Sequence, residues 1–330
     1  MDIAVIGAGA IGGTIASLLD RAGHEVEITA RGAHLDAISR NGIRLSGAWG
    51  DHVATVAAGE RLSRKPELVV LATKAMDAPG AARDNAAFLD GVPLVVVQNG
   101  LGGLEETARA APNSPVVGAL CLIAASLTAP GEIVVTTAAS TWLGMADPAA
   151  PGDAARFAAQ VLGEAVPCEV VQNFEGARWT KLIINQVNAL PAITGLTVQE
   201  VIDDPALRRL LTASMQEAAR VGLASGVRFE EVNQVTHDAL VRLAGSSPEQ
   251  GDFLALQLRA YLGDVPNPGS TLQSIRRGQA SEIDYLNGAI VSGGLAAGVP
   301  TPVNARLLEL VHQVERTGRF LEPGEVVAAL

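Results

Sequence analysis

The sequence predicts an α/β fold, in which an N-terminal doubly wound sheet of Rossmann type precedes an all-helical C-terminal domain. Short apolar runs with strand character alternate with helical patterns through roughly the first half of the chain. A glycine-rich turn joins the first strand to the first helix, and beyond Asn173 the apolar period is helical. Because "NFEG" breaks the pattern there, we predict domains over residues 1–173 and 174–330.

Length and composition fit a compact two-domain protein. The chain has 330 residues, of which 48% are hydrophobic and 18% charged, so general disorder is excluded. A net charge of −11 argues against a nucleic-acid partner, because few cations are present to replace phosphate counterions. One anionic cofactor needs only a few local cations and is compatible with this charge.

Cysteine and histidine usage indicates neither a disulfide framework nor a metal site. Cys121 and Cys168 are the only cysteines and form no CxxC pair, so we expect two buried thiols in a reducing compartment. The histidines show no metal-ligand spacing. They are His24, His34, His52, His237 and His312.

The N-terminal stretch predicts a buried strand over Asp2–Ile6 and a helix over Ile11–Ala22. The uncharged residues 4–19 could pass for the core of a signal peptide, but Asp2 stands where that segment would need a basic residue. The run is also too short and too rich in glycine to span a membrane. We therefore expect a cytoplasmic protein with no membrane partner.

The first strand is followed by glycines with the spacing G-x-G-x-x-G. Because this pattern follows a strand and opens a helix, it predicts a dinucleotide-binding loop. Gly7 permits the tight turn, Gly9 lets the backbone approach the pyrophosphate, and Gly12 allows close packing of helix on strand. The helix N-terminus supplies N–H donors for the phosphates. A purely structural strand–turn–helix is the alternative. The residues predicted to hold the pyrophosphate are Gly7, Ala8, Gly9, Ala10, Ile11 and Gly12.

The second strand, Glu25–Thr29, is followed by Arg31, where an NAD-binding protein usually has a carboxylate. A carboxylate accepts hydrogen bonds from the ribose 2′-hydroxyl and repels a 2′-phosphate. A guanidinium instead offers a planar set of donors that suits phosphate. Arg31 therefore predicts NADP(H) as the cofactor, unless it is simply a solvated surface arginine.

Two later strands also end in polar residues. Lys74 follows the strand Leu68–Ala72, and Asn99 follows the strand Pro93–Val97. The carboxyl ends of parallel strands form the edge at which open α/β sheets bind ligands. We therefore expect both residues in one crevice with the glycine-rich loop, and Lys74 beside Arg31 as a second cation for the phosphate.

The remaining elements follow from local pattern. "GIRLSGAWGDHVATV" predicts a hairpin. Further strands are predicted over residues 131–137, 141–147 and 168–172, and a covering helix over Ala154–Leu162. The second half predicts helices over Trp179–Leu190, Pro205–Ala224, Glu230–Leu243, Leu254–Leu262, Ser270–Arg277, Ile283–Ala297 and Pro302–Arg316.

The first of these helices carries a polar stripe. Lys181, Asn185 and Asn188 are spaced i, i+4, i+7 and lie within about 60° of one another on one helical face. Apolar residues fill the rest of the helix, and a lysine on a largely buried helix is costly unless it is paired or functional. A lysine that extends to solvent beside surface asparagines is the alternative.

A second polar cluster lies in "PNPGSTLQSIRRGQASEIDYLNG". Ser270 follows Pro-Gly and is predicted as the N-cap of its helix. Glu282 opens the helix Ile283–Ala297, where a carboxylate can simply interact with the helix dipole. A hydrolase is not supported, because the chain contains no G-x-S-x-G turn.

The glycine-rich loop, the polar residues after the later strands and the two polar clusters of the helical half belong to segments whose sequences resemble the ketopantoate reductases (2-dehydropantoate 2-reductases). The resemblance extends over nearly the whole chain. The order and distances of the segments fit as well, which is more specific than any single motif. The resemblance implies a Rossmann domain, a helical domain and a cleft in which ketopantoate is reduced to pantoate with NADPH, on the pathway to pantothenate and coenzyme A. The segments are "GAGAIG", Arg31, "TKAMD", "QNG", "RWTKLIIN", "STLQSIRRGQASEIDYLNG" and "GVPTPVN".

For the cofactor, the resemblance implies that Gly7–Gly12 holds the pyrophosphate and that Arg31 and Lys74 hold the 2′-phosphate. Asn99 would lie between the nicotinamide ribose and the substrate, and Glu282 would also contact the cofactor.

For the substrate, the resemblance implies that Lys181 donates a proton to the carbonyl oxygen as hydride reaches the carbon. Asn185 and Ser270 would bind the substrate, and Glu282 would help to hold Lys181. A nearby ammonium stabilises the charge that develops on that oxygen.

The chain departs from the family pattern at one position. Family members commonly have a second asparagine four residues after the first, whereas here Ala189 stands there and Asn188 comes one residue early. Asn188 lies on the same predicted face and is a candidate substitute as a substrate ligand. The alternatives are a related reductase of another branched or aromatic 2-ketoacid, or a regulator that senses NADP(H) without turnover. A homodimer is possible.

Overall fold

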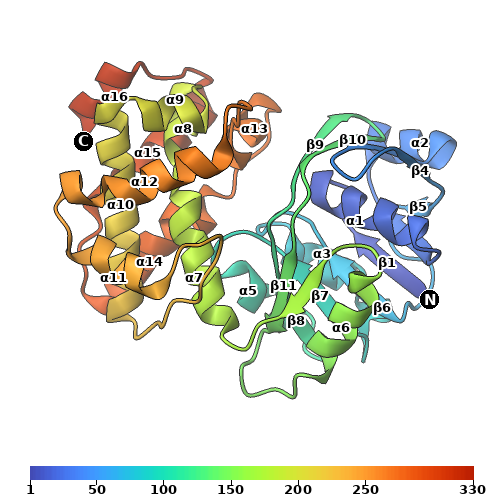
Figure 1. The fold of residues 1–330 in the computed structure, drawn as a ribbon. Helices are drawn as coiled ribbons and strands as arrows, with labels where there is room; N and C mark the ends of the chain where they lie inside the picture. The colour runs from blue at the N-terminus through green and yellow to red at the C-terminus, as the bar shows by residue number, and fades with distance from the viewer. The chain divides into compact units, whose positions relative to one another are not determined.

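The computed structural model describes all 330 residues except the side chain of Pro248, and the chain divides into two compact units (Figure 1). The first unit comprises Met1–Gln98 and Gly102–Phe174, and the second comprises Asn99–Leu101 and Glu175–Leu330. The first contains the strands and the second is helical, which confirms the predicted fold class. No helix in the described part of the chain is long and apolar enough to cross a bilayer.

The main sheet of the first unit has eight strands in the order β12-β11-β8-β7-β6-β1-β2-β5. All neighbouring pairs are parallel except β8 with β11. The central strands are buried along their whole length, as continuous runs of Val, Leu and Ile require. The strands are β1 (Asp2–Ile6), β2 (Glu25–Thr29), β5 (Ala57–Gly59), β6 (Leu68–Leu71), β7 (Leu94–Val97), β8 (Val116–Cys121), β11 (Thr141–Met145) and β12 (Cys168–Val170).

A second sheet of four strands, in the order β4-β3-β10-β9, accompanies the predicted doubly wound sheet. The predicted hairpin and the strand near residues 131–137 belong to it. Their residues alternate between buried and exposed, which is the pattern of a sheet covered on one face. The covered face packs on α1. The strands are β3 (Ile43–Gly47), β4 (His52–Ala54), β9 (Ala124–Ala129) and β10 (Glu132–Thr137).

Six helices complete the first unit. They are α1 (Ala10–Arg21), α2 (Gly32–Asn41), α3 (Ala78–Asp84), α4 (Ala86–Leu89), α5 (Gly103–Ala110) and α6 (Asp153–Gly163). Helix α1 follows the glycine-rich turn as predicted and buries eight consecutive residues, Gly12–Leu19. Helices α2, α3, α4 and α5 were not predicted, because each is shorter than the roughly 11 residues over which a helical period is recognised.

The second unit packs its helices around α10, which spans Pro205–Ala224 as predicted. Asp204 accepts hydrogen bonds from the N–H groups of Ala206 (2.8 Å) and Leu207 (3.0 Å), so the start of α10 is capped. The other helices are α7 (Phe174–Ile184), η1 (Asn185–Asn188), α8 (Ala189–Thr194), α9 (Val198–Asp203), α11 (His237–Gly245), α12 (Pro248–Leu262), α13 (Ser270–Arg276), η2 (Ile283–Tyr285), α14 (Asn287–Ala297), α15 (Pro302–Thr317) and α16 (Pro323–Ala329).

Three helix boundaries near the predicted site differ from prediction. The helix predicted over Trp179–Leu190 contains a 3₁₀ turn at Asn185–Asn188, which tightens the path of the polar stripe. The helix predicted from Ile283 is interrupted at Leu286, and α14 begins one residue later. Ser270 is not the N-cap of α13. Gly269 has that place, because its carbonyl oxygen accepts from the N–H of Gln273 at 3.2 Å.

The two cysteines lie on either side of β11. Thr141 pairs with Cys121 of β8 on one side and with Cys168 of β12 on the other. Neither cysteine forms a disulfide, and Cys121 is buried whereas Cys168 is only partly so, which corrects the expectation that both are buried. Burial, with a smaller contribution from Cys121, raises the pKa of Cys168 to about 12.

Candidate active site

The glycine-rich loop of the first unit has the geometry of a phosphate cradle. Gly7 has φ +102°, and a Cβ there would lie 2.8 Å from Cγ2 of Thr73. A Cβ at Gly12 would collide with the carbonyl oxygen of Gly7. Gly9 differs, because a Cβ there would meet nothing within 4 Å. The protein itself therefore does not require a glycine at this position, whereas a phosphate in that open space would.

Buried polar groups at the same sheet edge also fit a ligand. Oγ1 of Thr73, after β6, and the side-chain amide of Gln98, after β7, have no hydrogen-bond partner among the described residues. Buried polar atoms are nearly always bonded, so such groups at one edge point to a missing partner. Both observations agree with a dinucleotide bound at the carboxyl ends of these strands.

His34 is hydrogen-bonded to the glycine-rich loop, and this role was not predicted from the sequence. The N–H of Gly131 donates to Nδ1 of His34 at 2.9 Å, so Nε2 carries the proton and donates to the carbonyl oxygen of Ala8 at 2.6 Å. On the other side, the Ala8 N–H donates to the carbonyl oxygen of Thr29 at 3.0 Å. These bonds fix the carbonyl and the N–H of the residue between the first two glycines.

The two predicted phosphate ligands follow the strands that flank β1. Arg31 follows β2, and Lys74 follows β6, and each of these strands pairs in parallel with β1. The Arg31 side chain is 80% exposed, and Lys74 is half-buried. Both residues therefore lie at the carboxyl edge of the sheet, on the two sides of the glycine-rich loop.

In the second unit, the polar stripe begins with Lys181 near the end of α7. The residue is half-buried, and one helical turn later Asn185 opens the 3₁₀ turn. Nδ2 of Asn185 lies 3.5 Å from Oδ1 of Asn99, which clusters with the helical unit although it follows β7 in sequence. The N–H of Leu101 donates to the carbonyl oxygen of Tyr285 at 3.0 Å and anchors that segment.

Asn188 is occupied by contacts within the protein. It is 6% exposed, and its Nδ2 donates to the carbonyl oxygen of Asn185 at 2.9 Å. Its Oδ1 accepts from the backbone N–H of Ser270 at 2.9 Å and lies 3.4 Å from the Ser270 hydroxyl. A Cβ at Gly269 would approach the same oxygen to 2.7 Å. Asn188 thus positions Ser270 by joining two segments that are far apart in sequence.

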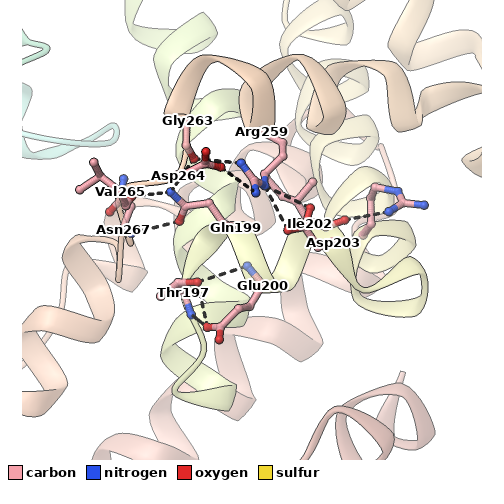
Figure 2. A network of polar contacts seen from close by, with 11 residues as sticks. Thr197, Gln199, Glu200, Ile202, Asp203, Arg259, Gly263, Asp264, Val265 and Asn267 are labelled. Carbon is pink, nitrogen blue, oxygen red and sulfur yellow. Dashed lines mark hydrogen bonds and ion pairs between the residues drawn. The ribbon is translucent and has the colours of Figure 1, made fainter.

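The loop that leads to Ser270 is tied to α9 by a polar network (Figure 2). Gln199 of α9 accepts from the N–H of Asn267 at 3.0 Å and donates to the carbonyl oxygen of Val265 at 2.6 Å. Nε of Arg259 lies 3.1 Å from both carboxylate oxygens of Asp203. These bonds hold the connection between α12 and α13 in place.

Glu282 stands directly before η2 and is half-buried. Its neighbours are held on both sides, because the Ser281 N–H donates to Oε1 of Glu315 at 2.9 Å and Asp284 lies 3.0 Å from Nε2 of His312. His312 in turn contacts Glu315 at 2.8 Å.

The charges of this cluster shift one another's pKa values. Burial alone would lower the pKa of His312, but hydrogen bonds to Glu315 and Asp284 raise it above its ordinary value. Burial would raise the pKa of Glu315, but hydrogen bonds from Ser281 and His312 lower it.

The structure therefore connects most of the predicted substrate residues. Asn99, Asn185, Asn188 and Ser270 form one continuous set of contacts, and Lys181 lies one turn from Asn185. Among the described residues, no group of three His, Cys, Asp or Glu is arranged to hold a metal ion.

Comparison with known families gives a consistent result over the whole chain. Residues 3–148 match the family model described as "Ketopantoate reductase PanE/ApbA", and residues 173–315 match the model for the C-terminal part of the same family. The 2-dehydropantoate 2-reductase of Mesorhizobium japonicum is 30% identical, and the alignment covers 95% of this chain and 98% of that protein. The enzyme of the same name from Archaeoglobus fulgidus is 28% identical, with 95% and 97% covered.

Solved structures agree. A PanE/ApbA family ketopantoate reductase from Ralstonia eutropha JMP134 superposes with a TM-score of 0.80 at 30% identity, covering 96% of this chain and 99% of that one. A D-mandelate dehydrogenase in complex with NADH superposes with a TM-score of 0.79 at 21% identity, covering 96% and 99%. At that identity, the second likeness shows a shared fold alone.

Proposed function

Because the chain belongs to the ketopantoate reductase family, we propose that it reduces 2-dehydropantoate (ketopantoate) to pantoate with NADPH, a step toward pantothenate and coenzyme A. The observation that carries the proposal is the set of contacts among Asn99, Asn185, Asn188 and Ser270, with Lys181 one turn away. A ketoacid bound along this set would meet amide and hydroxyl donors and one ammonium. Such groups stabilise negative charge that forms on a carbonyl oxygen.

The first unit supplies the binding groups for the cofactor. The loop Gly7–Gly12 and the N-terminus of α1 would hold the pyrophosphate, while Arg31 and Lys74 would hold the 2′-phosphate. When bound, NADPH supplies the hydride that adds to the ketone carbon. The open space beside Gly9 and the unpartnered amide of Gln98 support this placement.

Lys181 is the proposed proton donor. As the ketone carbon gains hydride, the electron pair of the carbonyl π bond moves to oxygen, and the Lys181 ammonium donates a proton to that oxygen. The neutral amine that remains regains its proton from solvent. Glu282 would orient the ammonium and favour its charged form. Asn185 and Ser270 would bind the ketoacid, and Asn99 would lie between it and the nicotinamide ribose.

Asn188 distinguishes this chain from the usual family pattern. Its amide group is bonded to Asn185 and Ser270, so we assign it a positioning role rather than a direct contact with substrate. The position where relatives commonly have the second asparagine is Ala189, which offers no polar side chain. A related branched or aromatic 2-ketoacid is therefore the second candidate substrate.

Substitution of Lys181 tests the mechanism. Lys181→Ala should lower kcat by about 10²–10⁴-fold, because a positioned acid is lost. Binding of NADPH should barely change, since its proposed contacts lie on the first unit. Lys181→Arg should recover little, because a guanidinium is a very poor proton donor. Lys65→Ala, which removes an exposed lysine, is the matched control.

Two outcomes would count against this role for Lys181. If Lys181→Ala raised only KM for the ketoacid, Lys181 would bind the substrate carboxylate and would not be the proton donor. No effect on kcat or KM would show that another group donates the proton. Glu282→Gln alone should reproduce part of the loss in kcat. In the double variant with Lys181→Ala, the two losses should not add fully, because coupled groups act as a unit. Circular dichroism on each variant separates a folding defect from a catalytic one.

A further inference from the structure

A second arginine leaves the main sheet beside Arg31. Strands β2 and β5 pair in parallel with Thr29 opposite Gly59. Arg31 follows the first of these residues by two positions, and Arg61 follows the second by two. Because adjacent strands lie about 4.8 Å apart, the two arginines emerge from neighbouring positions at the carboxyl edge.

Buried hydrogen bonds fix the backbone that carries Arg61. The N–H of Leu62 donates to Oδ1 of Asn85 at 2.8 Å, and Leu62 and Asn85 are 4% and 3% exposed. The N–H of Ser63 donates to Oε1 of Glu27 on β2, also at 2.8 Å. The loop after β5 is therefore tied both to β2 and to the end of α3.

This arrangement places Asp84, the residue before Asn85, between the two arginines. Nη2 of Arg31 lies 4.0 Å from Oδ2 of Asp84, and Nη2 of Arg61 lies 3.6 Å from Oδ1. Each guanidinium thus faces a different oxygen of one carboxylate, which is how two arginines share a bound anion. The side chains of Arg31, Arg61 and Asp84 are 80%, 67% and 45% exposed, so both ion pairs are solvated and weak.

A phosphate monoester is a stronger anion than this carboxylate. It carries about −1.5 to −2 charges at neutral pH and three acceptor oxygens. It can therefore replace a weakly held carboxylate between two guanidinium groups. The ribose 2′ position is where a dinucleotide held by the glycine-rich loop would present such a group to the end of β2.

We propose that Arg61 and Asp84 form, with Arg31, the part of the cofactor site that distinguishes NADPH from NADH. Arg61 is a second guanidinium for the 2′-phosphate. Asp84 holds both guanidinium groups together in the free protein and is displaced from them when the phosphate binds. Asp84 thus limits the preference for NADPH, while Arg61 increases it. This inference rests on the proposed use of a nicotinamide cofactor.

Measurements of ligand binding test the proposed roles of Arg61 and Asp84 and do not depend on catalytic activity. Dissociation constants for NADPH, NADH, adenosine 2′,5′-bisphosphate and adenosine 5′-monophosphate are measured by calorimetry. Arg61→Ala should weaken the two ligands that carry a 2′-phosphate by about five- to tenfold and leave the other two unchanged. Asp84→Asn should tighten the same two ligands about threefold, because a competing negative charge is removed. When Arg61→Ala is already present, Asp84→Asn should tighten these two ligands by a smaller factor.

Arg64→Ala is the matched control, because Arg64 lies in the same loop and pairs with Asp2 at 3.1 Å. It should change no dissociation constant. Equal losses for NADPH and NADH in Arg61→Ala, or a weaker 2′-phosphate ligand in Asp84→Asn, would overturn the inference while leaving the proposed function intact. A wild-type protein that binds neither dinucleotide would overturn the proposed function itself. If the wild type bound NADH more tightly than NADPH, recognition of the 2′-phosphate by these arginines would be excluded.

Discussion

Two sets of polar residues, one in each unit of the chain, lie in opposite environments. In the first unit, the arginines proposed to bind phosphate are largely exposed, and their ion pairs are long. In the second unit, a network of polar side chains is buried within the helical core, at no more than 5% exposure. Its members are Gln186, Ser214, Glu217, Asn287 and Asn304.

The buried network joins four helical segments. Oγ of Ser214 on α10 lies 3.0 Å from both Gln186 on η1 and Asn304 on α15. The carboxylate of Glu217 accepts the N–H groups of Val303 and Asn304, each at 2.9 Å. Glu217 thereby satisfies donors at the start of α15 that have no partner within the helix. The conspicuous "GVPTPVN" segment is consequently explained by helix capping.

The environment of a polar residue separates a role in binding from a role in folding. An exposed cation can be removed at little cost to stability, so its loss appears in ligand affinity. A buried polar group that is hydrogen-bonded to its neighbours cannot be removed without leaving those partners unsatisfied, so its loss appears in stability. Each of the following variants should behave according to the environment of the residue.

The largest effect is expected in the buried network. Asn304→Ala should lower the free energy of unfolding by about 3 kcal/mol, because Ser214, Glu217 and Asn287 each lose a partner. Urea denaturation measures the change. Arg316→Ala, at an exposed position of the same helix, should stay within about 0.5 kcal/mol of wild type. Equal effects of the two substitutions would contradict the proposed importance of the network.

The second-largest effect is expected at the glycine-rich loop, where a substitution should change cofactor affinity and leave stability unchanged. Gly9→Val should weaken NADPH by at least about a hundredfold, or ~2.7 kcal/mol, because the side chain takes the space needed by the pyrophosphate. Stability should hardly change, since φ of −65° suits valine and nothing lies within 4 Å. Gly163→Val, also in open space, is the control. Retained enhancement of NADPH fluorescence in Gly9→Val would exclude this loop as the cradle.

A smaller effect is expected for the exposed cation. Arg31→Ala should weaken NADPH about tenfold, or ~1.4 kcal/mol, and change NADH little. The free energy of unfolding should be unchanged, because the side chain is 80% exposed. Equal losses for both dinucleotides would show that Arg31 does not recognise the 2′-phosphate.

The smallest effect is a pH dependence from His312. Its pKa is raised above the ordinary value of 6.5, so its stabilising contribution is complete below that value and is lost as pH rises through the folded pKa. The pKa of Glu315 is lowered, so its contribution is present above 4.5 and is lost as pH falls through its folded pKa. Both side chains are partly exposed, which keeps the total below about 1 kcal/mol.

Denaturation of wild type and His312→Gln across this range measures that contribution. The two proteins should differ most at mildly acidic pH, between the titrations of the two groups, and should converge at alkaline pH. A difference that grows with pH would mean that the neutral imidazole is the stabilising form.

Features set by neighbouring residues were predicted well. The strand–turn–helix at Gly7–Gly12 follows from glycine spacing next to an apolar strand. The ends of α10 follow from Pro205 and the capping Asp204 at its start and from the loss of period after Ala224. In each case, the residues that determine the structure lie within a few positions of one another.

Features that depend on distant partners were not predicted. His34 acts through Ala8 and Gly131, which are 26 and 97 residues away. Arg61 follows a strand of only three residues, "AAG", which shows no strand pattern of its own. Asn188 was predicted on the correct helix, but the 3₁₀ turn and the bond to Ser270, 82 residues away, decide what its amide contacts.

Turnover by the wild type decides whether this chain reduces a 2-ketoacid with NADPH. The measurement is kcat/KM for ketopantoate, set against a panel of other branched and aromatic 2-ketoacids and followed by the loss of NADPH absorbance. We expect oxidation of NADPH with equimolar formation of the 2-hydroxyacid, and the highest kcat/KM for ketopantoate. A higher value for another ketoacid would reassign the substrate and retain the reaction. Tight binding of NADPH with no turnover of any ketoacid would exclude the proposed reaction.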